Sequence, residues 1–334
     1  MVQNLEQNLE VYQTVKRWLT KLKTRSDSES TEKSGLLWLR DFCNFAKTNP
    51  DSLIKERTKN LESTVQGIRR KHEELLEAFI IKMKNEDYAP NMRARRASYA
   101  PNSISTASGM IRSFYKSNYL ALQEVRSPRP YNVRMYKVPT IKDIKKMCEH
   151  ADLSTRTWLL CAKDSGLGNA DLLPLTLSNL SSEYGTIASQ LRKGTVPVHI
   201  ELRRHKTKEA IHSFFGPNAI EALKQYVNVN ARGRIFTMSA RSLQQKIKAL
   251  SIQTKVATKE VPVRCYSMRK TFNTYMKLAG VNEAIVEVMM GHSIGRVRGA
   301  YLQTGSGSSG IGIPISKLVE AYMQAYPTIN INQV

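Results

Sequence analysis

The sequence predicts a mainly α-helical protein with one small antiparallel β-sheet, divided into two domains. Over most of the chain, apolar residues recur at three- and four-residue spacing, which is typical of helices. One segment, around residues 196–202, alternates apolar and polar residues instead, as a half-buried strand does. The 334 residues exceed the usual size of a single core, so we expect two domains.

The first helix should lie within residues 1–30, which we take as an N-terminal helical segment. Its apolar residues are Leu9, Tyr12, Val15, Trp18, Leu19 and Leu22. The polar stretch 24–34 follows, and its composition is typical of a linker. A second helix carries Leu36, Leu37, Leu39, Phe42 and Phe45. We expect it to end near Pro50, because proline disfavours helix at the residue before it.

Two more helices complete a predicted helical domain over residues 31–125. One runs from about Glu62 to Lys84 with Ile68, Leu75, Phe79 and Ile80 inward. The other starts near Ser103 and carries Ile104, Ile111, Phe114, Tyr115 and Leu120. Residues 88–103 between them form a basic loop flanked by prolines. Residues 126–138 form a basic, proline-containing linker that suits a strap along a phosphate backbone.

A second domain should occupy residues 139–310. It begins with a short helix from Thr140 and an apolar helix around 157–163. The alternating segment carries Val196, Val198, Ile200 and Leu202, and we expect a hairpin with its turn near 206–209 and a return strand over 211–215. Beyond Gly216 the pattern is mainly helical.

The C-terminal residues 311–334 contain one more helix, preceded by the glycine- and serine-rich stretch 304–312. Tyr322 and Tyr326 share this helix with Leu318 and Val319, and we expect both tyrosines to pack in a core or against a partner. The helix is a candidate tail for docking on a neighbouring subunit.

The charge of the chain indicates a polyanionic partner. There are 51 Lys and Arg residues against 28 Asp and Glu, a formal net charge of +23, and the basic residues recur along the whole chain. No apolar run approaches the roughly 20 residues that span a bilayer, and the N-terminus does not resemble a signal peptide. We therefore expect nucleic acid as the partner, which the motifs below specify as double-stranded DNA, and the cytoplasm, with the nucleoid, as the location.

The four cysteines do not predict a metal site or a disulfide. Cys43, Cys148, Cys161 and Cys265 are widely spaced and form no C-x-x-C pair. We expect reduced and mostly buried thiols, and no metal.

Three short motifs near the C-terminus contain the residues best suited to catalysis. They are YSMRKTF, MMGHS and GAYLQ, which place Arg269, His292 and Tyr301 in that order, with Tyr301 nine positions after His292. A tyrosine hydroxyl, with a pKa near 10, is a poor nucleophile unless its proton is removed or its developing charge is balanced. Arg269 can donate two parallel hydrogen bonds to phosphate oxygens, and His292 can assist. Gly291 should end the preceding helix and hold the imidazole at a fixed point.

In these motifs the chain resembles the tyrosine recombinase, or phage-type integrase, family, and it is most similar to integrases of archaeal mobile elements. The resemblance covers most of residues 140–325 and implies a mixed α/β catalytic domain. The preceding helical domain is similar to the family's core-binding domain only in architecture. The resemblance further implies a site-specific recombinase that joins two DNA sites within a tetramer.

The same resemblance implies the chemistry. Tyr301 would attack a phosphodiester to form a 3′-phosphotyrosine and release a 5′ hydroxyl, with no metal, ATP or other cofactor. Lys206, at the predicted hairpin tip, would be the general acid that protonates the leaving oxygen. Lys208 is the rival for this role, and either lysine could instead only contact phosphates.

The chain departs from the family pattern at two positions. Gly168 stands where an arginine usually follows a Gly-Leu pair, so one phosphate-binding side chain is absent. Loss of one such donor typically lowers the rate about a hundred- to a thousand-fold. Arg264, Arg296 and Arg298 are candidate substitutes. Tyr266 stands where a histidine is commoner, and its phenol can still donate a hydrogen bond.

Further basic residues are expected to contact DNA rather than to react. They are Arg93, Arg95, Arg96, Arg112, Lys116, Arg203, Arg204 and Lys208. Two other functions remain open: a recombinase-like DNA-binding protein with weak or no catalysis, which Gly168 favours, and a type IB-like topoisomerase using the same tyrosine chemistry.

Overall fold

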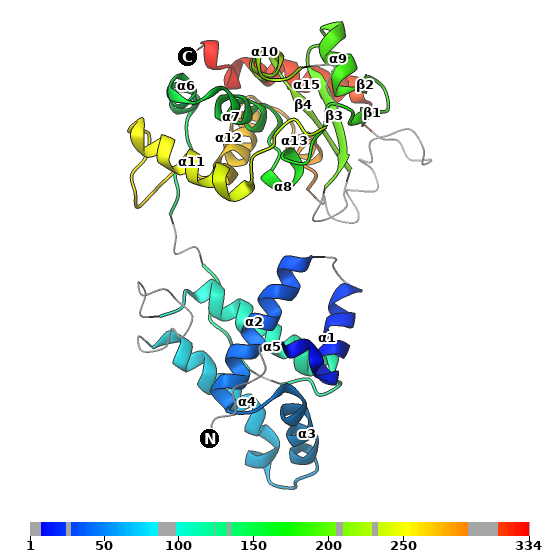
Figure 1. Ribbon diagram of the computed structural model, residues 1–334, viewed down its shortest axis with the longest axis vertical. Coiled ribbons are helices and arrows are strands. Elements are labelled where there is room, and N and C mark those ends of the chain that lie inside the picture. The colour runs from blue at the N-terminus through cyan, green and yellow to red at the C-terminus, as the bar shows by residue number, and fades with distance from the viewer. Residues whose placement is uncertain are drawn as a thin grey trace. The chain divides into compact units, whose positions relative to one another are not determined.

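The computed structural model describes residues 8–24, 28–85, 98–123, 125–131, 135–204, 210–228, 233–292 and 313–333. The chain divides into two compact units, Met1–Val133 and Arg134–Val334, each with its own hydrophobic core (Figure 1). The described residues are mostly helical, with two small antiparallel sheets in the second unit. This confirms the predicted fold class.

The first unit is all-helical among its described residues. Its elements are η1 (Leu9–Val11), α1 (Gln13–Lys23), α2 (Glu29–Ala46), α3 (Pro50–Leu61), α4 (Gln66–Lys84) and α5 (Pro101–Ser117). Aromatic side chains from four of them meet edge to face in the core. The ring centroids of Trp18 and Phe114 are 5.7 Å apart, and those of Phe42 and Phe79 are 5.4 Å apart. Because Trp18 lies on α1, the N-terminal helical segment shares one core with the helices that follow it.

One predicted boundary in this unit was wrong and one helix was missed, while the predicted end of the second helix near Pro50 is confirmed, because α2 ends at Ala46. The second half of the expected linker 24–34 is the beginning of α2, where the Ser28 hydroxyl caps the helix by accepting a hydrogen bond from Thr31 N, and two glutamates lie in the first turn. Pro50 begins a helix, α3, that was not predicted from the sequence. Proline is favourable at the first position of a helix, and the Asn49 side chain caps it by accepting from Ser52 N.

One expected core residue of α4 is also outside the core. Ile68 is 44% exposed, in the first turn of the helix, whereas Leu76, Phe79 and Ile80 further along are buried. The packing of α4 against its neighbours therefore starts about two turns after the helix does.

The second unit contains helices around two hairpins. Its elements are α6 (Ile141–His150), α7 (Leu153–Ser165), α8 (Asn169–Leu172), β1 (Leu180–Ser181), β2 (Gly185–Thr186), α9 (Ile187–Lys193), β3 (Val198–Arg203), β4 (Ala210–Phe215), α10 (Pro217–Tyr226), α11 (Ala240–Gln253), α12 (Cys265–Leu278), α13 (Glu283–Met289), α15 (Ile315–Ala325), η2 (Tyr326–Ile329) and η3 (Ile331–Gln333). The predicted helix after Thr140 is confirmed. Thr140 and Asp143 form a capping box at its start.

The predicted hairpin is confirmed as β3 and β4, which pair antiparallel from Val198↔Phe215 to Arg203↔Ala210. The expectation of a half-buried strand at 196–202 was wrong in detail, because three consecutive residues of β3, Val198, His199 and Ile200, are buried. The hairpin is covered on both faces, since α9 and β1 contact β3 while α7, α13 and α15 contact β4 (Figure 1). The predicted turn at 206–209 lies outside the described residues. The two-residue strands β1 and β2 are too short to show any alternation in the sequence.

The C-terminal segment packs into the core of its own chain. The Tyr322 hydroxyl donates to the Asp164 carbonyl at 3.0 Å, and the Tyr326 hydroxyl accepts from Asn218 N at 2.8 Å. Lys163, fully buried, forms an ion pair with Asp164 and donates to the carbonyl of Ile329 at 2.6 Å. The expected core packing of both tyrosines is confirmed. Docking of this segment on a neighbouring subunit would require these contacts to break or to be exchanged.

The cysteines are buried and free, as expected. Burial raises the pKa of Cys148 to about 12 and that of Cys265 to about 11, so both thiols are protonated at neutral pH. In the described part of the chain, no helix has the length and apolar character to cross a bilayer, and no three His, Cys, Asp or Glu side chains gather as metal ligands.

Candidate active site

Arg269 lies at the centre of the candidate site and is only 2% exposed. It projects from the second turn of α12, and its Nη1 donates to the carbonyl of Gly166 at 2.8 Å while its Nη2 donates to the carbonyl of Met290. These carbonyls belong to the residues that end α7 and α13. A guanidinium is favourable there, because the C-terminal ends of helices carry partial negative charge. Arg269 thus joins three helices.

The electrostatic environment of Arg269 opposes its charge. Burial, followed by the neighbouring positive charge of Arg204, lowers the pKa of Arg269 to about 10. Asp171 and Glu287 act in the opposite direction, and the guanidinium stays charged at neutral pH. Its Nε has no hydrogen-bond partner among the described residues. Contact with a phosphate would use the N–H groups that the two carbonyls leave free.

His292 is fixed by the end of α13, as the sequence predicted. Gly291 has φ of +60°, its N–H donates to Val288 O at 3.0 Å, and the N–H of His292 donates to Glu287 O at 2.9 Å. This pair of hydrogen bonds is a Schellman motif, which requires the left-handed backbone that glycine adopts most easily. The expected helix end at Gly291 is confirmed.

The His292 ring is oriented by an acid on the same helix. Its Nδ1 is hydrogen-bonded to the Glu287 carboxylate, and the Lys277 ammonium lies 3.5 Å from that carboxylate. The His292 side chain is 31% exposed. A carboxylate at Nδ1 sets which ring nitrogen carries the proton, and it leaves Nε2 to face a ligand.

Gly291 also allows a close approach between α13 and the β3–β4 hairpin. A Cβ at this position would lie 2.3 Å from Cγ1 of Ile211 on β4. Arg204, directly after β3, donates from Nη1 to the carbonyl of Gly291 at 3.2 Å. The hairpin therefore brings Arg204 next to the backbone that holds His292.

Gly168, where the family pattern has arginine, lies two residues beyond the carbonyl that Arg269 binds. It precedes α8 with an extended backbone, φ −80° and ψ 164°. A Cβ there would meet only Oδ2 of Asp171, at 3.9 Å. A Cβ at position 168 would therefore make no contact closer than 3.9 Å, two residues along the chain from the Gly166 carbonyl that Arg269 binds.

Tyr266 and Arg264 lie at the start of α12. Tyr266 is 54% exposed, and its ring is 6.5 Å from that of Tyr136 in an edge-to-face arrangement. The guanidinium of Arg264 lies 6.0 Å from the centre of the Tyr136 ring. Both residues are near the surface, one turn before Arg269. Arg203 is exposed at the end of β3.

Several expected site residues lie outside the described residues. They are Tyr301, Lys206, Lys208, Arg93, Arg95, Arg96, Arg296 and Arg298. The described part of the site consists of Arg204, Arg269 and His292. The carbonyls of Gly166 and Met290 accept hydrogen bonds from Arg269, and the carbonyl of Gly291 accepts one from Arg204.

Two parts of this site were not predicted from the sequence. Glu287 has a weak signal, because an acid five residues before a histidine, across a predicted helix end, can reach the ring. No pattern in the sequence indicates that the Gly166 carbonyl accepts a hydrogen bond from Arg269. Gly166 has a φ of +63°, and a Cβ at this position would lie 2.5 Å from Cδ1 of Phe272. Both facts explain why glycine ends α7 there, against α12.

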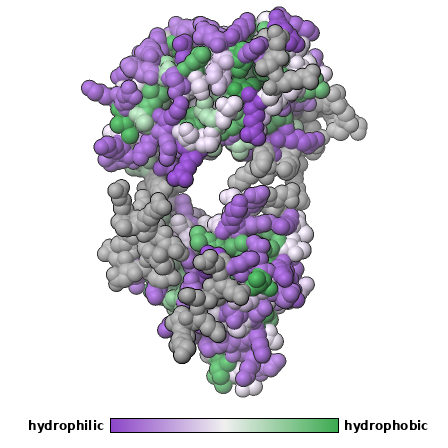
Figure 2. Space-filling model, in the orientation of Figure 1, coloured by the Kyte–Doolittle hydropathy of each residue, from purple (hydrophilic) through white to green (hydrophobic). Residues whose placement is uncertain are grey.

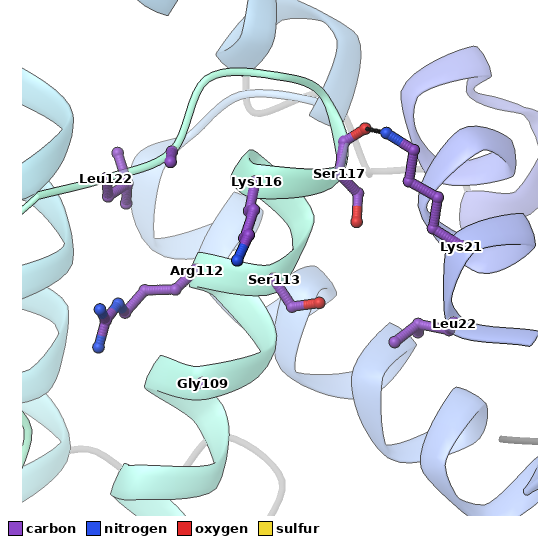
Figure 3. A pocket seen from close by; sticks show the side chains of 9 residues that line it. Lys21, Leu22, Gly109, Arg112, Ser113, Lys116, Ser117 and Leu122 are labelled. Atoms are coloured by element: carbon purple, nitrogen blue, oxygen red, sulfur yellow. Dashed lines mark hydrogen bonds between the residues drawn. The ribbon is translucent and has the colours of Figure 1, made fainter. Parts of the chain in front are cut away.

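A basic groove lies between α1 and α5 in the first unit. Arg112 and Lys116 are one turn apart on α5, and Lys21 comes from α1, where its Nζ donates to the carbonyl of Ser117 at 2.8 Å (Figure 3). The groove has a volume of about 600 Å³. Neither Arg112 nor Lys116 forms an ion pair with a residue that the structure describes. The sequence did not point to Lys21, because its place beside α5 depends on a contact between distant segments.

Hydrophilic side chains cover most of the visible surface of both units (Figure 2). The chain carries a net charge of +23, and three of its cations, Lys21, Arg112 and Lys116, line the basic groove. The arrangement is typical of a surface that binds phosphates.

Comparison with known proteins relates the chain to solved structures alone: no family model matches it, and no curated protein does. A lambda integrase dimer bound to a COC′ core site is similar at a TM-score of 0.51, with 12% identity over 89% of this chain and 98% of that chain. The XerH site-specific recombinase bound to palindromic difH substrate, in a post-cleavage complex, has a TM-score of 0.49, with 10% identity over 87% and 92% of the two chains. Because the sequence identity is only 12%, the similarity to the lambda integrase dimer shows a shared fold and nothing further. The chain therefore has the mainly helical fold, with small antiparallel sheets, of a DNA integrase.

Proposed function

We propose that this protein is a site-specific DNA recombinase that cleaves and rejoins strands through a 3′-phosphotyrosine intermediate. The observation that carries the proposal is the meeting of Arg204, Arg269 and His292 at the ends of β3, α7 and α13 within an integrase fold. Tyr301, nine positions after His292 in the sequence, is the proposed nucleophile.

The proposed reaction transfers a phosphoryl group of DNA from one oxygen to another, and the bond that forms is similar in energy to the bond that breaks. The Oη of Tyr301 forms a bond to phosphorus, and the bond from phosphorus to the 5′ oxygen breaks. The phenol gives up its proton to solvent water, and the leaving oxygen gains one from Lys206 or, in the rival assignment, Lys208. Arg269 and His292 balance the charge that develops on the non-bridging oxygens. The reverse reaction with a 5′ hydroxyl of another strand completes the exchange.

Duplex DNA is the proposed partner, held mostly through its phosphates. In the first unit, the basic groove with Lys21, Arg112 and Lys116 is the proposed contact. Arg93, Arg95 and Arg96 of the first unit and Arg203 of the second are further proposed phosphate contacts. We further propose that four copies assemble on paired sites in the nucleoid.

A nicked duplex tests the proposal directly. The probe is a pool of nicked duplexes that covers the DNA flanking the gene, because a nick beside the cleaved bond lets the short product strand diffuse away and traps the covalent complex. The intact protein should form a protein–DNA adduct that resists denaturation, and Tyr301→Phe should form none. Tyr226→Phe is the matched control, since Tyr226 packs on Phe236 away from these residues, and it should form the adduct at the normal rate.

The absence of an arginine at position 168 supports a second candidate, a DNA-binding protein without catalysis. Specific binding with no adduct on any bound sequence would favour this candidate and overturn the first. Relaxation of supercoiled plasmid without exchange between sites would instead indicate a topoisomerase.

A further inference from the structure

Arg204 is positioned more tightly than a residue that only contacts DNA nonspecifically. It directly follows β3, it is half-buried, and its Nη1 donates to the carbonyl of Gly291 at 3.2 Å. Its Cδ lies 3.6 Å from the point where a Cβ on Gly291 would stand. The side chain therefore runs along the backbone that ends α13 and supports His292.

The positive charge of Arg204 is not neutralised within the described part of the chain. Arg204 forms no ion pair there, and its nearest hydrogen-bond acceptor is a neutral carbonyl. The charge acts instead on the buried guanidinium of Arg269, whose charged form it disfavours. Of the acids near Arg269, Glu287 is already bonded to His292 and paired with Lys277.

Arg204 and Arg269 donate to successive carbonyls at the end of α13, those of Gly291 and Met290. Their like charges repel each other, and this costs free energy until an anion lies near both. A phosphate does this well, since each of its non-bridging oxygens accepts several hydrogen bonds. The same region lacks a side chain at Gly168, where only Oδ2 of Asp171 lies within 4 Å of a Cβ position.

We propose that Arg204 supplies the guanidinium that position 168 lacks, and that it donates to a non-bridging oxygen of the phosphate attacked by Tyr301. This inference rests on the proposed function. Arg204 forms and breaks no covalent bond in the step. Its bond to Gly291 O holds one nitrogen in place, and its other N–H groups face the ligand and balance the charge that develops during transfer.

The first test measures the rate of adduct formation on the nicked duplexes. Arg204→Ala should slow it about a hundred- to a thousand-fold, the usual effect of losing one preorganised donor to a developing anion, with duplex binding affected far less. Arg204→Gln retains a donor for Gly291 O without the charge, so it separates loss of charge from loss of the local structure. It should be as slow as Arg204→Ala. Arg241→Ala, an exposed arginine of α11, is the control and should react at the normal rate.

A double variant tests whether an arginine at position 168 restores the rate that Arg204→Ala loses. Because a Cβ at position 168 would make no contact closer than 3.9 Å, Gly168→Arg combined with Arg204→Ala should recover at least about tenfold of the lost rate. A merely structural role of Arg204 would not be restored by an arginine at 168. An active Arg204→Gln variant, or a double variant as slow as Arg204→Ala, would overturn the inference.

A second test does not depend on catalysis. Single phosphates of a bound duplex are replaced one at a time by uncharged methylphosphonates, and affinities are measured for the intact protein and for Arg204→Ala. At one linkage the two changes should be non-additive, because each removes the same contact: the methylphosphonate should weaken binding of the intact protein but not that of Arg204→Ala. If no linkage shows such coupling, the inference is wrong, whether or not the protein forms an adduct. If the affinities show this coupling but no adduct forms, the phosphate contact of Arg204 is supported and the proposed catalysis is rejected.

Discussion

Replacement of Gly291 by alanine tests how the end of α13 positions the site. Two separate costs arise. The left-handed backbone at φ +60° costs a non-glycine residue about 1–2 kcal/mol. The new methyl group would lie 2.3 Å from Cγ1 of Ile211, and an overpacked position of this kind costs about 1–3 kcal/mol more. Gly291→Ala should therefore lower the free energy of unfolding by about 2–5 kcal/mol.

Gly194 provides a matched control in the same unit. It ends α9 at φ +72°, but a Cβ there would have no atom within 4 Å. Gly194→Ala should lose only the backbone cost of about 1–2 kcal/mol. The difference between the two variants isolates the collision with β4.

Urea unfolding of both variants, followed by fluorescence and circular dichroism, measures these losses. Gly291→Ala should also slow adduct formation more than Gly194→Ala, because the displaced carbonyl holds Arg204. Equal stability losses in the two variants would refute the claim that α13 and the hairpin require glycine at their contact.

Two further predictions concern buried charge. Arg57 and Glu73 form a buried ion pair at 2.5 Å, with 3% and 4% of their side chains exposed, so Arg57→Ala should destabilise the first unit by about 3–5 kcal/mol in urea unfolding. The exposed pair of Lys71 with Glu56 should lose less than about 1 kcal/mol on Lys71→Ala, and similar losses in the two variants would contradict this reasoning. Burial lowers the pKa of His199 from 6.5 to about 4, so between these pH values the unfolded chain binds a proton that the folded chain does not, and stability falls as the pH falls, by about 2 kcal/mol from pH 7 to pH 5. Unfolding at both pH values should show this loss in the normal protein and a smaller one in His199→Phe; an unchanged pH dependence in the variant would exclude His199 as its source.

Local patterns in the sequence were sufficient for most elements and for part of the site. The alternation around Val198 to Leu202 predicted the hairpin, and Gly291 predicted the end of α13, because both depend on neighbouring residues. At Pro50 the same local reasoning predicted the end of the second helix correctly but missed α3, which begins at this proline. A proline can both disfavour helix before it and begin a helix after it. At Pro50 the capping side chain of Asn49 is the local sign that a new helix begins.

The charge of the protein, the order of most of its helices and the spacing of Arg269, His292 and Tyr301 could all be obtained from the amino-acid sequence. These properties follow from composition and from interactions within a few residues. The surroundings of Arg269 required the folded chain. Its carbonyl partner Gly166 is 103 positions away in the chain, and Arg204 is 87 positions from its partner Gly291.

Periodicity shows which face of a helix or strand is buried, but it does not show which element covers that face. The groove between α1 and α5 is an example, because Lys21 joins Arg112 and Lys116 only where the two helices pack side by side. The absence of an arginine at position 168 was visible in the sequence. That Arg204 lies beside Arg269, at the end of a hairpin covered by α13, follows from the packing of the whole unit.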